Sequence, residues 1–139
     1  MPNYICRWLE RNDRFECRLA ENHFMMISPI IQQTRCEAYL RRQATRKSGV
    51  NIADVTSLFT ALCVMGPLSR AVLSELTETD MSPKSFPFFT VKEIDIGSAS
   101  GIRATNLTHT GELGWVLYVP NESALHVYDK IMEHGRKYS

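Results

Sequence analysis

The residues of this chain that are most typical of acid–base chemistry are His109 and Glu112, within the segment His109-Thr110-Gly111-Glu112. A histidine titrates near neutral pH, and a nearby carboxylate can orient its ring or take part in proton transfer. The segment lies between two expected strands, where loops often carry functional side chains. A His and a Glu three residues apart also occur in ordinary polar turns. The sequence therefore assigns no catalytic residue and keeps a small enzyme at this loop as its second alternative.

The motifs that would hold a metal or a cofactor give no positive signal. Four cysteines occur at long and irregular spacings: Cys6, Cys17, Cys36 and Cys63. Structural zinc sites use closely spaced pairs of ligands, so these cysteines predict no metal site. No glycine-rich phosphate-binding motif precedes an expected helix. We therefore predict no cofactor.

A basic segment is the best candidate for contact with a partner. Its cations are Arg35, Arg41, Arg42, Arg46 and Lys47. On a helix over about 30–46, Arg35, Arg42 and Arg46 fall along one stripe, with Arg41 beside it. Such a stripe can neutralise phosphates along a nucleic acid or dock an acidic protein surface. We predict these five residues as partner contacts and keep a nucleic-acid-binding regulator as the first alternative.

Residues 3–9 and 14–20 predict a β-hairpin around the loop 10–13. In this register Trp8 faces Phe15 and Cys6 faces Cys17 on one side, while Arg7 meets Glu16 on the other. A slip of one residue would scatter the apolar side chains and separate the charge pair, so the register is well specified. A disulfide between Cys6 and Cys17 is geometrically conceivable but somewhat tight, and in a reducing compartment both are expected to be small core residues.

The middle of the chain predicts helices. After the helix over about 30–46, Asn51 is expected to begin a second one, with an apolar i, i+3, i+4 stripe over 52–63. The opposite side of that helix is also uncharged, which indicates a central core helix or an oligomer contact. We therefore predict a homodimer buried along 52–72. Gly66-Pro67 ends this helix, and a further helix is expected from Pro67 to about Thr79.

The last part of the chain predicts three strands and a terminal helix. The strands are expected over 86–96, 102–107 and 115–119, followed by a helix from Asn121 to Gly135. Because strands and helices are clustered, the sequence predicts an α+β fold. It consists of an N-terminal β-hairpin, two or three central helices, an antiparallel three-strand meander and a C-terminal helix. All 139 residues are expected to form one domain.

Composition and charge restrict the class of protein. Apolar residues make up 44% of the chain and charged residues 22%, values typical of a folded domain. The net charge of +1 argues against a dedicated nucleic-acid coat protein. No secretory signal is visible at Met1-Pro2-Asn3, and the uncharged stretch 55–69 is shorter than a membrane span, so a cytoplasmic, intracellular location is predicted.

By elimination the sequence favours a function in binding. We expect a small, soluble, non-enzymatic protein-interaction domain, such as an adaptor, regulator, inhibitor or chaperone-like module. Its partner is expected to be another protein, and no membrane is involved.

Overall fold

The structure is a computed structural model that describes residues 4–9, 14–45 and 49–138. The strands are β1 Tyr4–Leu9, β2 Arg14–Ala20, β3 His23–Ile27, β4 Phe59–Met65, β5 Thr90–Ile96, β6 Ala99–Asn106 and β7 Gly114–Pro120. The helices are α1 Gln33–Ala44, α2 Ser69–Leu76 and α3 Ala124–Gly135, with short 3-10 turns at Ile30–Gln32, Thr56–Leu58, Asn121–Ser123 and Arg136–Tyr138. The α+β prediction is confirmed.

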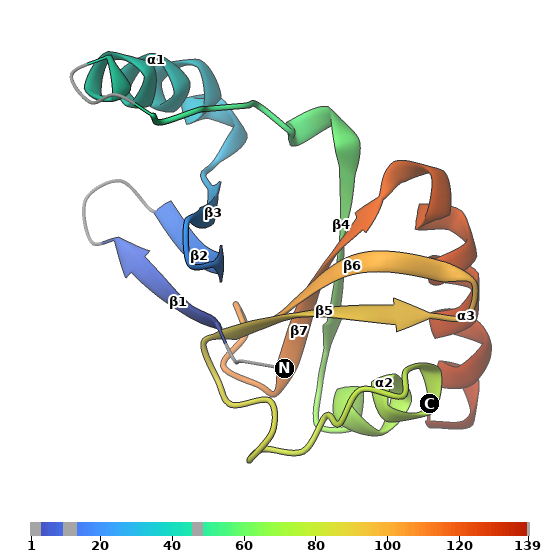
Figure 1. The fold of residues 1–139 in the computed structure, drawn as a ribbon. Helices are drawn as coiled ribbons and strands as arrows, with labels where there is room; N and C mark the ends of the chain where they lie inside the picture. The colour runs from blue at the N-terminus through green and yellow to red at the C-terminus, as the bar shows by residue number, and fades with distance from the viewer. Residues whose placement is uncertain (1–3, 10–13, 46–48, 139) are drawn as a thin grey trace.

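All strand pairs are antiparallel, in the order β3-β2-β1-β5-β6-β7-β4. Figure 1 shows α2 and α3 covering one side of β4–β7, while the β1–β2–β3 unit lies toward the other side. The predicted meander of three strands is β5-β6-β7, and β4 joins its far edge. The β4–β7 part of the sheet thus has helices on one face, while the β1–β3 part of the same sheet lies toward its other face.

The register of the N-terminal hairpin is confirmed. Cys6 pairs with Cys17, Arg7 with Glu16, Trp8 with Phe15 and Leu9 with Arg14. The predicted loop 10–13 lies outside the described residues. The short apolar run before the first helix forms β3, which pairs with β2. Alternation of apolar and polar side chains was sufficient here because only one register puts the whole apolar set on one face.

The predicted helix that begins at Asn51 and ends at Gly66-Pro67 is wrong. Residues 59–65 form strand β4, which pairs along its full length with β7, from Phe59 opposite Pro120 to Met65 opposite Gly114. Leu62 and Val64 pack against the core beneath α2 and α3, whereas Met65 packs against the second core on the opposite face. A strand that is apolar on both faces also produces a helical stripe, so periodicity alone did not separate the two. The homodimer along 52–72 rested on that helix and loses its basis.

The main core lies between the sheet and helices α2 and α3. Its buried members include Trp115, Phe86, Leu73, Leu117 and Val127. Trp115 is fully buried and packs edge-to-face against Phe86, with ring centroids 6.0 Å apart. A second core on the other face of the sheet is formed by Cys6, Phe15, Cys17, Met25, Val91, Leu107 and Val116. The N-terminal strands are therefore part of the folded unit.

Lys137 and Tyr138, after α3, are held against α2 by contacts with Glu75. The Lys137 ammonium group forms an ion pair with Glu75, and the Tyr138 hydroxyl donates a hydrogen bond to the same carboxylate. These hydrogen bonds, led by that from Lys137, hold the pKa of Glu75 below its ordinary value. The ionised carboxylate is therefore favoured in the folded protein.

We predict that Lys137→Ala raises the pKa of Glu75 toward its ordinary value. Because the folded pKa is depressed, the stabilisation from this cluster is present above the ordinary pKa of Glu75 and is lost as the pH falls through the folded value. NMR titration of the Glu75 carboxyl carbon in the two proteins measures the shift. Lys130→Ala, which breaks an exposed pair with Glu133 on α3, is the control. An unchanged Glu75 titration in Lys137→Ala would contradict the contact.

Candidate functional site

Helix α1 carries the predicted contact residues and stands apart from the sheet (Figure 1). Arg35, Arg41 and Arg42 are exposed on it, whereas Arg46 and Lys47 lie outside the described residues. Large apolar side chains are exposed beside these arginines: Ile30 and Ile31 are 73% and 91% exposed, and Tyr39 is 45% exposed. A surface that combines arginine with apolar and aromatic side chains is typical of protein interfaces.

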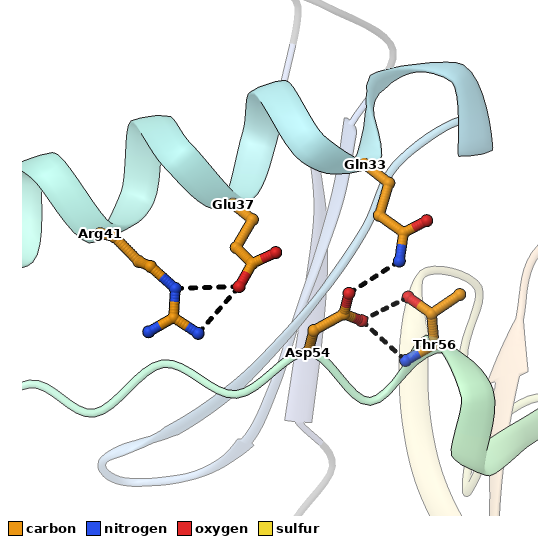
Figure 2. A network of polar contacts seen from close by, with 5 residues as sticks. All are labelled: Gln33, Glu37, Arg41, Asp54 and Thr56. Atoms are coloured by element: carbon orange, nitrogen blue, oxygen red, sulfur yellow. Dashed lines mark hydrogen bonds and ion pairs between the residues drawn. The ribbon is translucent and has the colours of Figure 1, made fainter.

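A polar network joins α1 to the extended segment that follows it (Figure 2). The Gln33 amide donates to Asp54 Oδ2 over 2.7 Å. Asp54 Oδ1 accepts from the backbone N–H and the hydroxyl of Thr56, at 2.9 and 2.6 Å. The hydrogen bonds from Thr56, followed by that from Gln33, lower the pKa of Asp54. Asp54 therefore fixes a turn and a contact with α1 together.

Arg41 is not a free cation on this surface. Its Nε donates to Glu37 Oε1 over 2.9 Å, and its guanidinium forms an ion pair with the same carboxylate. An exposed i, i+4 pair of this kind contributes only about 0.3–0.5 kcal/mol, so a partner's carboxylate can replace Glu37 at small cost. Arg41 also lines an open depression of about 320 Å³ with Ala44, Thr45, Val50, Asn51 and Ile52. This depression is too open to exclude water from a reaction.

The His109–Glu112 segment forms the loop between β6 and β7, and both side chains are exposed. The threonines of this loop accept hydrogen bonds within it: Thr110 N–H donates to Thr108 Oγ1 over 3.2 Å, and Glu112 N–H to Thr110 Oγ1 over 3.5 Å. The loop is anchored next to α2, because Gly66 N–H donates to the Leu113 carbonyl over 2.8 Å. The structure shows an exposed, bent loop here, without a hydrogen bond between His109 and Glu112 in the described residues.

Potential metal ligands do not converge in the part of the chain that the structure describes, where no three His, Cys, Asp or Glu residues are grouped for an ion. None of the helices among these residues is long and apolar enough to cross a membrane. The exposed apolar side chains of α1 and the role of Asp54 were missed from the sequence. The spacing of Asp54 and Thr56, two residues apart, was the available signal for a turn.

The sequence pattern of the GCVT N-terminal domain matches residues 11–139. The chain belongs to this family. Among its relatives is the mitochondrial pyruvate dehydrogenase phosphatase regulatory subunit of Mus musculus, 46% identical over 127 residues, which are 91% of this chain and 14% of the relative. Human mitochondrial sarcosine dehydrogenase is 37% identical over 95 residues, 67% of this chain and 10% of that protein. An aminomethyltransferase of Caldanaerobacter subterraneus is 34% identical over 89 residues, 64% of this chain and 23% of that protein.

Membership of the GCVT N-terminal domain family corrects the predicted function. The prediction of a small, non-enzymatic protein-interaction domain is wrong, because the family includes aminomethyltransferase and dehydrogenase enzymes as well as a regulatory subunit. The nucleic-acid-binding alternative has no counterpart among these relatives, and neither has the homo-oligomer. This chain spans 14% of the length of the phosphatase regulatory subunit and 10% of the lengths of sarcosine dehydrogenase and dimethylglycine dehydrogenase. Two of the three relatives described above are mitochondrial, so the cytoplasmic prediction is not supported.

Proposed function

We propose that this chain belongs to a longer mitochondrial protein that regulates a phosphatase acting on pyruvate dehydrogenase. The observation that carries the proposal is the 46% identity with the mouse regulatory subunit over 91% of the chain. The similarity to sarcosine dehydrogenase is both lower and shorter, at 37% over 67% of the chain. In this proposal the GCVT N-terminal domain is one part of the regulatory polypeptide.

The surface of α1 supplies a contact for a protein partner in this proposal. Arg35 and Arg42 are exposed cations on α1, Tyr39 is an exposed side chain on the same helix, and Ile31 is exposed in the 3-10 turn that precedes it. Apolar side chains supply buried area at an interface, while surrounding arginines set orientation and the rate of association. An acidic surface with an apolar centre would fit this helix.

The test uses the full-length polypeptide that contains this chain, mixed with a pyruvate dehydrogenase phosphatase catalytic subunit and phosphorylated pyruvate dehydrogenase. We expect the protein to change the rate of dephosphorylation. An unchanged rate, together with reduction of an electron acceptor when sarcosine or dimethylglycine is added, would contradict the proposal and favour an enzyme instead.

We predict that the double variant R35E/R42E weakens binding to the catalytic subunit roughly tenfold and reduces its salt dependence, because two favourable charges become repulsive. Lys84→Glu, at an exposed residue between α2 and β5, is the matched charge reversal outside α1. Surface plasmon resonance at two salt concentrations measures both effects. Equal weakening by Lys84→Glu and R35E/R42E would remove α1 as the contact surface.

A second candidate function is the oxidation of an N-methylated amino acid, which the other relatives suggest. Sarcosine and dimethylglycine are N-methylated amino acids, and a 4-methylaminobutanoate oxidase of Paenarthrobacter nicotinovorans is 31% identical over 86% of this chain. A longer protein that oxidises an N-methylated amino acid is therefore the alternative. The two assays described above separate the proposals. A regulatory subunit changes the dephosphorylation rate, whereas an oxidising enzyme reduces the electron acceptor.

A further inference from the structure

Cys6 and Cys17 lie directly opposite each other in the β1–β2 pair, with their Sγ atoms 2.6 Å apart. The Cys6 N–H donates to the Phe89 carbonyl, at 2.8 Å, and so points away from β2. In antiparallel strands a residue whose backbone bonds to the other neighbour occupies a non-hydrogen-bonded pair, in which the two Cα atoms are closest. Cys6 and Cys17 thus form a non-hydrogen-bonded pair, in which the opposing side chains lie close together.

The Cys6–Cys17 pair lies where the N-terminal strands join the main sheet. Both cysteines are buried in the second core, at 3% and 0% exposure. Among the described residues, β1 joins the main sheet through the pairs Tyr4 with Val91 and Ile5 with Thr90, next to the bond from Cys6 to Phe89. A covalent link at this point would tie β1 to β2 where the N-terminal strands meet the main sheet.

We propose that Cys6 and Cys17 form a reversible dithiol–disulfide site that exchanges with glutathione. One cysteine thiolate attacks glutathione disulfide, which forms a mixed disulfide and releases one glutathione. The second cysteine thiolate then attacks the first cysteine's sulfur and releases the other glutathione. The two cysteines are oxidised by two electrons, glutathione disulfide is reduced by two, and the two thiol protons end on two glutathione molecules.

Burial controls how readily the site reacts. The hydrogen bond with Cys17, followed by burial, raises the pKa of the Cys6 thiol far above its ordinary value. A protonated and buried thiol is a poor nucleophile, so exchange requires the hairpin to open locally. Cys63 is exposed on β4, but it has no second thiol placed opposite it in the strand pairing, since its partner in β7 is Val116. Cys6 and Cys17, by contrast, are placed opposite each other by the strand pairing.

The sequence allows a direct test on the full-length protein. Trypsin cleaves after Arg7 and Arg14, so it separates the peptide that contains Cys6 from the peptide that contains Cys17. The protein is equilibrated in buffers of increasing glutathione disulfide, free thiols are blocked with N-ethylmaleimide, and the digest is analysed by mass spectrometry. We expect the two peptides to appear linked, in an amount that rises with the disulfide ratio and disappears after dithiothreitol.

The controls separate an internal disulfide from general thiol oxidation. Cys63→Ser is expected to leave the linked peptide unchanged, whereas Cys17→Ser should abolish it and leave Cys6 alkylated. In the oxidised wild-type protein, backbone amides of β1 and β2 should exchange hydrogen about tenfold more slowly, because the link suppresses local opening. Glutathione adducts alone at every ratio, or unchanged exchange in a linked protein, would overturn the proposal.

Discussion

Phe86→Ala is expected to lower the free energy of unfolding of this domain by about 3–5 kcal/mol. Phe86 is fully buried, and its ring contacts Trp115 edge-to-face. The Lys92 ammonium also lies 5.2 Å from the centre of the same ring. Truncation leaves a cavity next to the largest side chain of the core and removes both ring contacts. Urea denaturation followed by tryptophan fluorescence measures the loss.

Phe88→Ala is the matched control for Phe86→Ala. Phe88 is two residues away and 55% exposed, and its ring contacts that of its neighbour Phe89. We expect a loss of about 1 kcal/mol or less, because little apolar area is returned to water. The hydrogen bond from the Asn106 side-chain amide to the Phe86 backbone carbonyl is retained in both variants. Similar losses for the two phenylalanines would contradict the placement of the segment before β5.

The hairpin shows what a single sequence specifies well. The alternation around Cys6, Trp8, Phe15 and Cys17 gives one register in which the apolar set shares a face, and the structure has that register. The energetic reason is local, because a slip of one residue moves every side chain to the other face. Such a pattern needs no information from the rest of the chain.

Strand β4 shows where the same reasoning failed. Phe59–Met65 is apolar on both faces because Leu62 and Val64 meet the helical layer while Met65 meets the N-terminal strands. Whether this segment follows the two-residue period of a strand or the 3.6-residue period of a helix depends on its tertiary neighbours, chiefly β7. These neighbours are distant in sequence. The basic residues Arg35, Arg41 and Arg42 were located correctly on α1. Their role as partner contacts stays a prediction, because the chemistry that would define a partner belongs to another molecule.

The junction between β4 and β7 also predicts the second large effect, for Gly114→Ala. Gly114 is buried at the start of β7, directly opposite Met65. A Cβ added at Gly114 would lie 2.8 Å from Met65 Cγ and 3.2 Å from both Met65 Cα and the Val64 carbonyl oxygen. The side chain of Met65 can move, but the backbone atoms of β4 cannot do so without breaking the strand pair. We expect a loss of about 1–3 kcal/mol in the free energy of unfolding.

Gly135→Ala is the control that isolates this steric effect. Gly135 is the last residue of α3, and a Cβ built there has no neighbour within 4 Å. Alanine in a helix is favoured over glycine by about 0.5–1 kcal/mol, so this variant should be neutral or stabilised. The two substitutions add the same methyl group and differ only in the space that receives it. Opposite signs in urea denaturation would therefore support close β4–β7 packing, whereas a stabilised Gly114→Ala would show that β4 does not approach β7 this closely.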